Sequence, residues 1–245
     1  MAQLTRRARR ERSRRFTRVV APPPEARPRE GESLAERYSR LADERWTKAP
    51  VDFVLRGLDV VLAAVALVVL SPLIGLVAVA VRLESRGPAF YRGLRVGKAG
   101  RLFTMFKFRT LRADAETRLG PYLGAELTRL TDDEVTRVGR GLRATHLDEL
   151  PQLVNVLAGD MSIVGPRPIR PAFFEELCED IPQYWQRLVV APGITGFAQL
   201  RMTREMTWAE KLAHDLEYIA DRSVRLYSSI ILETAASIPR RARGG

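Results

Sequence analysis

Two adjacent carboxylates, Asp148 and Glu149, are the side chains in this sequence best suited to chemistry. They lie in the stretch 147–153 (LDELPQL), where Pro151 is tolerated in a first helical turn and apolar residues then recur at helical spacing. If Asp148 caps this helix, the helix dipole and the free amides of the first turn favour its ionised form. Such a carboxylate suits a nucleophile or a magnesium ligand. The alternative is a capped surface helix without chemistry.

Basic residues elsewhere in the chain could bind phosphate groups. Lys107 and Arg109 flank Phe108 at the end of a predicted strand, where two cations could hold a pyrophosphate. Arg167 lies between two prolines in 165–168 (GPRP), which reduces the conformational freedom lost when its guanidinium meets a phosphate. Taken alone, the first motif also fits a basic strand end, and the second fits a rigid surface turn.

Short elements must position these residues. Aromatic, strand-like segments in 89–108, with turn residues at 96–100, predict a small β-hairpin that presents Lys107. The stretch 110–146 is predicted to form a helix and a polar connecting segment. The glycine-punctuated segment 192–199 (PGITGFAQ) is too irregular for a nucleotide fingerprint, so it either lines a substrate pocket or only connects elements.

An uncharged apolar run from Val60 to Val81 is about long enough to cross a bilayer as one helix. However, Ser71 and Pro72 lie in its middle, where proline removes a helical hydrogen bond and predicts a sharp bend. Basic residues flank both ends, so the positive-inside tendency keeps both ends cytoplasmic. We therefore favour a re-entrant helix-break-helix over a spanning helix. The Ser71 hydroxyl could satisfy backbone groups freed at the bend.

Polar residues and later helices complete the predicted architecture, an α+β fold that is mainly helical. Arg56 and Asp59, at helical spacing before the apolar run, are expected to pair at headgroup depth. Two helical patterns, 208–222 and 224–238, carry apolar faces. Those faces suit amphipathic helices at a membrane interface and also suit ordinary core packing.

The amino-acid composition limits the kinds of partner that this protein could bind. The 245 residues carry 40 basic and 29 acidic side chains, a net charge of +11, which implies phosphates, a membrane surface or nucleic acid as partners. The single cysteine, Cys178, and the lack of a Cys/His cluster indicate a reducing compartment without structural zinc. The chain divides into a basic, disordered arm (1–45), a re-entrant membrane hairpin (46–82), a catalytic domain (83–238) and a basic tail (239–245). The arginines of the arm could bind nucleic acid or anionic lipid headgroups, and lipid contact is favoured over nucleic-acid binding and over a merely solvated tail.

In this order, the membrane segment, KFR (107–109), LDELPQL, GDMS (159–162), GPRP and PGITGFAQ resemble the bacterial monotopic phosphoglycosyl transferases, from about Val51 to about Ile238. The resemblance implies transfer of a sugar-1-phosphate from a UDP-sugar to a polyprenyl phosphate, undecaprenyl or decaprenyl, with release of UMP. It also implies Mg²⁺, a covalent aspartyl phosphosugar intermediate and a role in initiating exopolysaccharide, capsule or other glycan assembly. The catalytic domain would lie on the cytoplasmic face of the inner membrane. No nucleic acid is expected as a partner, and the oligomeric state is not predicted.

Carried onto this sequence, the resemblance makes Asp148 the nucleophile and Glu149 its partner, which helps to bind Mg²⁺ or to manage a proton. The chain departs from the family pattern at Gly93, His146 and Tyr227, positions that bear on sugar recognition and on docking of the C-terminal helix. A non-catalytic membrane-anchored scaffold or adaptor of a glycan assembly complex is the alternative. The family positions matched elsewhere are the basic residues Lys107, Arg109, Arg143 and Arg167 for phosphate and UDP contacts, Asp215 for substrate, Asp59 with no role assigned, and Ser71 and Pro72 for the helix break.

Overall fold

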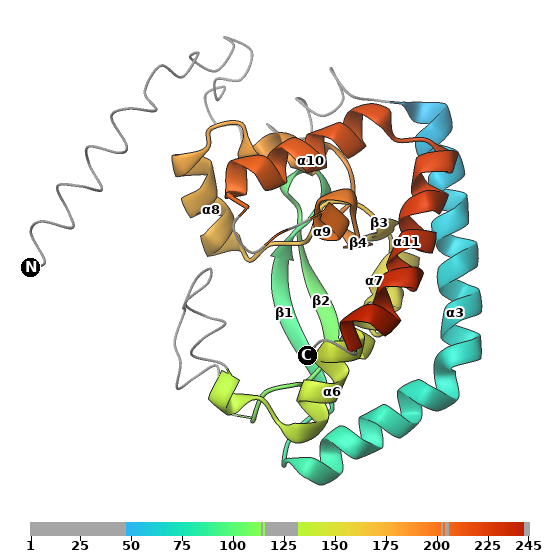
Figure 1. The fold of residues 1–245 in the computed structure, drawn as a ribbon, viewed down its shortest axis with the longest axis vertical. Helices are drawn as coiled ribbons and strands as arrows, with labels where there is room; N and C mark the ends of the chain where they lie inside the picture. The colour runs from blue at the N-terminus through green and yellow to red at the C-terminus, as the bar shows by residue number, and fades with distance from the viewer. Residues whose placement is uncertain (1–47, 114, 116–131, 202, 204–205, 243–245) are drawn as a thin grey trace, which may run out of the picture.

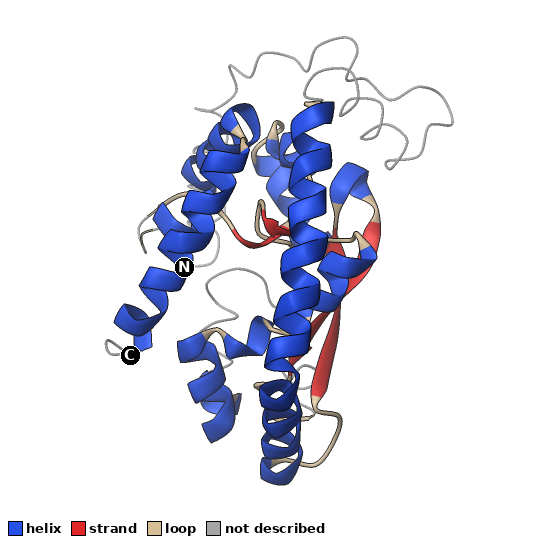
Figure 2. Ribbon diagram, turned by 90° about the vertical axis from the view of Figure 1, so that its right-hand side faces the viewer, coloured by secondary structure: helices blue, strands red, loops and turns tan. Residues whose placement is uncertain are grey.

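The computed structural model describes residues 48–113, 115, 132–201, 203 and 206–242. The predicted basic arm (1–45), part of the 110–146 connection and the last residues of the predicted basic tail lie outside the described residues. In the described part the chain is mainly helical, with two small two-stranded sheets, which confirms the predicted class. In both views the longer strands run roughly along the length of the longest helix (Figure 1 and Figure 2).

The longest helix, α3 (Ala49–Glu84), contains the apolar run and continues through Pro72. Figure 1 shows this helix bending partway along its length. Pro72 cannot donate to the carbonyl of Val68 four residues earlier, and the Ser71 hydroxyl donates to that carbonyl instead, at 2.8 Å. The predicted bend and the predicted role of the Ser71 hydroxyl are both confirmed. The predicted break, however, is a bend within one continuous helix.

Among the described residues, α3 is the one helix long and apolar enough to cross a membrane. Only 11% of its most apolar window is buried inside the protein, so most of that surface faces outward. Such a surface is unusual unless something apolar covers it, which indicates membrane association. The re-entrant path remains a prediction, because a helix of this length also satisfies a spanning arrangement.

Polar side chains in the first half of α3 attach it to the rest of the protein. The buried Asp59 carboxylate accepts hydrogen bonds from the Tyr227 hydroxyl (2.7 Å), the Ile163 amide (2.8 Å) and the Ser162 hydroxyl (3.0 Å). Tyr227 therefore docks the C-terminal helix through a hydroxyl–carboxylate bond.

The expected pairing of Arg56 with Asp59 is wrong. Arg56 instead donates to the carbonyls of Val156 and Leu157, at 2.6 and 3.0 Å. These carbonyls lie in the last turn of α7 (Gln152–Ala158), where the Val156 carbonyl also accepts from the Gly159 amide at 3.1 Å and helix-end carbonyls need partners from outside the helix. Arg56 therefore binds the end of α7, and Asp59 binds its three donors, so the two side chains do not pair with each other.

The predicted hairpin is confirmed. Strands β1 (Phe90–Val96) and β2 (Leu102–Phe108) pair antiparallel, with Tyr91 opposite Lys107 and Val96 opposite Leu102. A short 3-10 turn, Lys98–Gly100, joins them. The hairpin thus delivers Lys107 near the end of its second strand.

A second, parallel pair of strands was not predicted. Strand β3 (Ser162–Val164) pairs with β4 (Gly193–Thr195), and the short helix α9 (Phe197–Arg201) follows, so the segment read as a loop is a strand and a helix. Gly193 and Gly165 approach so closely that a Cβ on Gly193 would collide with the Gly165 amide nitrogen. This contact sets the spacing of the two segments.

The remaining described helices surround these strands. The apolar faces of α10 (Trp208–Asp221) and α11 (Val224–Ala242) bury Leu212, Ile219 and Ile230, so core packing accounts for those faces. Their predicted placement at a membrane interface remains a prediction. The other elements are the 3-10 turns Asp132–Glu134, Leu147–Glu149 and Tyr184–Val189 and the helices α6 (Arg137–Thr145) and α8 (Pro171–Asp180).

Candidate active site

A tight turn between α6 and α7 holds the carboxylate pair. His146 ends α6 in a left-handed conformation (φ 57°), and Leu147–Glu149 then form a 3-10 turn. Asp148 and Glu149 are both buried there, at 9% and 8% exposure. The prediction that Asp148 caps the following α-helix is wrong, because the chain reverses at His146 and α7 begins only after Pro151.

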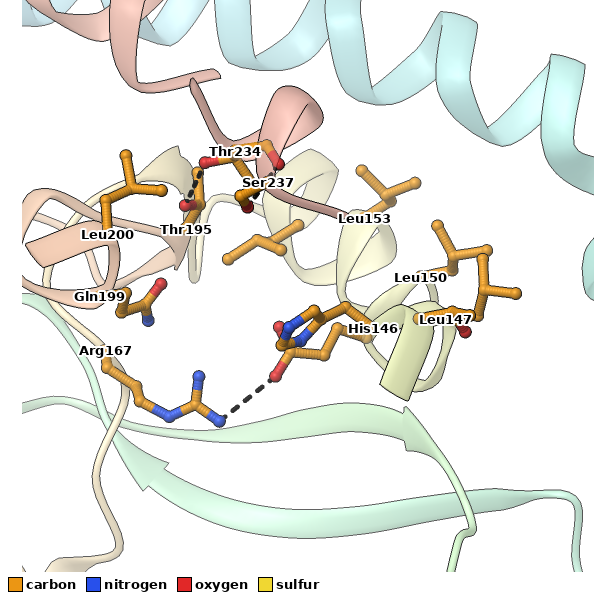
Figure 3. A pocket seen from close by; sticks show the side chains of 13 residues that line it. His146, Leu147, Leu150, Leu153, Arg167, Thr195, Gln199, Leu200, Thr234 and Ser237 are labelled. Carbon is orange, nitrogen blue, oxygen red and sulfur yellow. Dashed lines mark hydrogen bonds and ion pairs between the residues drawn. The ribbon is translucent and has the colours of Figure 1, made fainter. Parts of the chain in front are cut away.

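Two of the predicted cations meet this pair. Lys107, from β2, places its Nζ 2.6 Å from Glu149 Oε1 and 3.8 Å from Asp148 Oδ2. Arg167, from the GPRP segment, places a guanidinium nitrogen 3.3 Å from the same Glu149 oxygen, the contact drawn as a dashed line from Arg167 in Figure 3. The structure therefore brings together four residues from three separate segments of the sequence.

The two carboxylates occupy different electrostatic environments. Burial alone would raise the pKa of Glu149, but Arg167 and Lys107 outweigh it and hold that pKa at about 2. Burial raises the pKa of Asp148, and the more distant Lys107 offsets this only in part. Glu149 is therefore a fixed anion that anchors the cations. Asp148 is therefore the more basic of the two carboxylates.

Asn155, a residue that the sequence analysis did not single out, fixes the carboxylate turn against the hairpin. Its side-chain amide donates to the Thr104 carbonyl (2.7 Å) and accepts from the Phe106 amide (3.0 Å). Asn155 lies in α7, just after the carboxylates, whereas Phe106 directly precedes Lys107. The distance from Lys107 to the carboxylates is thus set by a buried amide bridge.

A cavity of about 450 Å³ opens beside the Glu149–Arg167 pair. In Figure 3, leucines of the carboxylate turn and α7 lie on one side, and polar side chains from β4, α9 and α11 lie on the other. The apolar side includes Leu147, Leu150 and Leu153, and the polar side includes Thr195, Gln199, Thr234 and Ser237.

A second cavity, of about 90 Å³, shares Glu149 and Arg167 with the first. Lys107 and Arg95 also line it, so among its described lining residues three cations face one carboxylate. This excess of positive charge favours an anion. Arg95 was not among the predicted site residues. The signal was present, because strand alternation places Arg95 and Lys107 on one face of the hairpin once the register is known.

Two predicted phosphate ligands line neither cavity. Arg109 donates to the carbonyls of Ser85 and Arg86, at 2.7 and 2.9 Å, and so stabilises the chain where α3 ends. Arg143 donates from Nε to the Thr110 hydroxyl at 3.0 Å. Their contacts with a substrate remain predictions, and the structure places neither side chain at a cavity.

Asp215 lies behind the site. Its carboxylate contacts the Arg187 guanidinium at 2.8 and 3.0 Å, and both side chains are almost fully buried. Arg187 also donates to the backbone carbonyl of Arg167 at 2.9 Å. Asp215 is thus placed to support the segment that carries Arg167, and its contact with substrate stays a prediction.

The side chains near the carboxylate pair show whether the site could hold the predicted magnesium ion. Within the described residues, no group of three or more His, Cys, Asp or Glu side chains is arranged to hold a metal. However, Mg²⁺ commonly binds through one or two carboxylates, and substrate phosphates and water complete its shell. The adjacent carboxylates of Asp148 and Glu149 fit such a site, provided that a phosphorylated substrate supplies the other ligands.

A buried carboxylate pair, an excess of cations and an adjoining cavity together suit a phosphorylated substrate. Residues 51–241 match the family model described as bacterial sugar transferase. The chain therefore belongs to the bacterial sugar transferase family, as the motifs predicted, and is an enzyme of the phosphoglycosyl transferase class.

Three relatives illustrate the similarity. The chain is 43% identical over 196 residues to a UDP-glucose:undecaprenyl-phosphate glucose-1-phosphate transferase of Caulobacter vibrioides, covering 78% of this chain and 72% of the relative. It is 38% identical to the exopolysaccharide production protein PSS of Rhizobium leguminosarum, covering 79% and 100%. It is 39% identical to an N-acetylgalactosaminephosphotransferase of Aeromonas hydrophila, covering 76% of this chain but only 44% of that longer protein.

Proposed function

We propose that this chain transfers a sugar-1-phosphate from a UDP-sugar to a polyprenyl phosphate, undecaprenyl or decaprenyl phosphate, and releases UMP. The observation that carries the proposal is the buried Asp148–Glu149 pair held between Lys107 and Arg167. The names of the relatives, which specify sugar phosphate transfer to undecaprenyl phosphate, support the same reaction.

In the first step, a carboxylate oxygen of Asp148 attacks the phosphorus that bears the sugar. The bond from this phosphorus to the bridging oxygen breaks, UMP leaves, and an aspartyl phosphosugar forms. Lys107 and Arg167 neutralise phosphate oxygens that would otherwise repel the attacking carboxylate. Arg95, which lines the smaller cavity, adds a third positive charge for the diphosphate.

In the second step, a phosphate oxygen of the acceptor lipid attacks the same phosphorus and breaks its bond to Asp148. This releases the polyprenyl diphosphate sugar and restores the carboxylate. The acceptor is already an anion, so neither step requires a general base. Glu149, with a pKa of about 2, stays ionised near neutral pH and serves to hold the cations. Mg²⁺ bound by Asp148 and Glu149 would neutralise further phosphate charge.

The test is UMP release by the detergent-purified protein from a panel of UDP-sugars with polyprenyl phosphate and Mg²⁺. Asp148→Asn should lower the rate at least about a thousandfold, because a carboxamide is a poor nucleophile. Asp180→Asn, the same change at an exposed residue, is the matched control. Without acceptor, the wild-type protein should gain the mass of a phosphosugar, and Asp148→Asn should not. Turnover by Asp148→Asn at the wild-type rate would refute the proposed nucleophile.

The membrane part of the proposal is a re-entrant α3 that keeps the catalytic domain on the cytoplasmic face of the inner membrane. The exposed apolar surface, the bend at Pro72 and the basic flanks support it. In a Cys178→Ser background, Gly57→Cys and Leu83→Cys place thiols at either end of the apolar run. Both should resist an impermeant thiol reagent in intact cells and react after permeabilisation. Labelling of only one of them in intact cells would establish a spanning helix instead.

The glycan served is proposed to be an exopolysaccharide, a capsule or a related polymer whose assembly this transfer initiates. The similarity to the exopolysaccharide production protein supports this class of product. Deletion of the gene should abolish the polymer, and complementation with Asp148→Asn should not restore it. Restoration by that variant would favour a non-catalytic scaffold.

A further inference from the structure

Gln152 is a buried glutamine on the wall of the smaller cavity. It begins α7 and is only 2% exposed. No hydrogen bond joins its side-chain amide to the other described residues. Among those residues, the unpartnered side-chain atoms that are fully sealed off are Arg109 Nε and Gln199 Nε2, so the Gln152 amide is open to the cavity instead. A buried amide without a protein partner is costly and therefore rare unless something else binds it.

The cavity beside Gln152 carries more positive than negative charge. Among its described lining residues, Arg95, Lys107 and Arg167 face the one carboxylate of Glu149. Burial lowers the pKa of Lys107, and the neighbouring charge of Arg167 lowers it further. The volume of about 90 Å³ has room for about three water molecules, and one phosphate group can take their place. The charge and the size of the cavity both suit a single phosphate group.

We propose that this cavity holds the phosphate group that leaves as UMP, and that Gln152 is a catalytic residue that donates from Nε2 to an oxygen of this group. The assignment rests on the proposed function and deepens it. Glu149 lines the cavity, whereas Asp148, the proposed nucleophile, does not. The phosphorus that Asp148 attacks must lie against Asp148 and hence outside the cavity. The other phosphate of the donor, attached through the bridging oxygen, is therefore the one that fits.

A donor at this place acts in the first step of the reaction. When the bond from the sugar-bearing phosphorus to the bridging oxygen breaks, its electron pair stays on that oxygen, and the departing phosphate gains negative charge. The Gln152 amide offers two N–H donors and does not titrate, so it stabilises this charge without a proton transfer. The nearby cations neutralise the phosphate, and the amide fixes its orientation among them. UMP is absent from the second step, so Gln152 has no part in it.

The first test compares the binding of UMP and of uridine to the full chain by calorimetry, at one Mg²⁺ concentration. In Gln152→Leu, which removes the amide at similar size, the Kd for UMP should rise about 10- to 100-fold, the effect of losing a hydrogen bond to a charged group. The Kd for uridine, which lacks the phosphate, should stay within about twofold. Gln152→Glu, a variant of equal size, should weaken UMP binding at least as much, because its carboxylate would face the phosphate. Gln183→Leu, the same change at an exposed glutamine, is the matched control.

The two steps of the reaction separate a role toward the leaving group from a structural one. In a single turnover without acceptor, UMP release by Gln152→Leu should be about 10- to 100-fold slower than in the wild type. Once formed, the phosphosugar on Asp148 should pass to polyprenyl phosphate at a rate within about twofold of the wild-type rate. Equal slowing of both steps would overturn the assignment, because a distorted site would slow both. A clear fall in melting temperature would also overturn it, since the variant removes an amide that has no protein partner.

The binding measurement keeps the phosphate cavity distinct from the proposed function, because it needs no turnover. If UMP binding depended on Gln152 but no UDP-sugar released UMP, the proposed function would fail and the phosphate cavity would stand. An unchanged Kd for UMP in Gln152→Leu would overturn the cavity assignment even in an active enzyme. Equal weakening of UMP and uridine binding would place Gln152 beside the base and would overturn it too.

Discussion

The buried pair of Arg187 and Asp215 should make Arg187→Met alone more damaging than Arg187→Met combined with Asp215→Leu. The two side chains are only 5% and 6% exposed, and their atoms approach to 2.8 Å. Removing the cation alone leaves a buried carboxylate without its partner, which costs about 3–5 kcal/mol. Removing both charges abolishes that penalty. What remains is the lost bond from Arg187 to the Arg167 carbonyl, worth about 0.5–1.5 kcal/mol.

The stability of Arg187→Met should also depend on pH. Burial raises the pKa of Asp215 even beside Arg187, and loss of Arg187 removes the main opposing influence. In Arg187→Met the neutral carboxyl is tolerated, so its stability deficit should be largest above neutral pH and should shrink as pH falls through the raised pKa. The double variant, which lacks the titrating carboxyl, should show no such change relative to wild type.

Urea unfolding in detergent, followed by tryptophan fluorescence at pH 5 and pH 8, measures the free energy of unfolding for the three proteins. The KM for the UDP-sugar tests the connection to Arg167. It should rise up to about tenfold in the double variant, because the segment carrying Arg167 loses an anchor while the fold is retained. A double variant as unstable as Arg187→Met, or a deficit that does not shrink at pH 5, would refute this account.

Three further substitutions or treatments follow from the structure. Burial raises the pKa of Cys178 to about 11, so alkylation by iodoacetamide should be slow at pH 8 and should accelerate only near that value; a midpoint near pH 8.5 would contradict this. Thr207→Ala removes the capping box of α10 and should lower the free energy of unfolding by about 1 kcal/mol, whereas Thr207→Ser should retain it. Tyr227→Phe removes one of three donors to buried Asp59 and should cost about 1.5–3 kcal/mol in urea unfolding, and a loss below about 0.5 kcal/mol would show that the bond is not important.

Local patterns predicted the elements of this protein well. The aromatic alternation around 89–108 predicted the hairpin, and Ser71-Pro72 predicted the bend in α3 and its hydroxyl partner. The motifs also named four residues that converge, Lys107, Asp148, Glu149 and Arg167. Each of these predictions depends on neighbours within a few positions or on an ordered set of motifs.

Features that depend on packing between distant segments were missed. Strands β3 and β4 are three residues each, too short for a periodic signal, and their pairing relies on two glycines meeting in space. The left-handed turn at His146 moved Asp148 out of the expected cap position, since a histidine is not a usual signal for that conformation. The position of Arg95 at the site required the register of the hairpin.

The amide bridge of Asn155 also covers part of the exposed edge of the hairpin. By binding the Thr104 carbonyl and the Phe106 amide together, the side chain satisfies the groups that a neighbouring parallel strand would use opposite Met105. On the other strand, Val96 forms a bridge with Ile169. A two-stranded ribbon with open edges invites pairing with another chain. Here the Asn155 amide covers part of one edge of the hairpin, and the bridge to Ile169 covers part of the other. The hairpin can therefore position Lys107 without offering both edges for pairing with another chain.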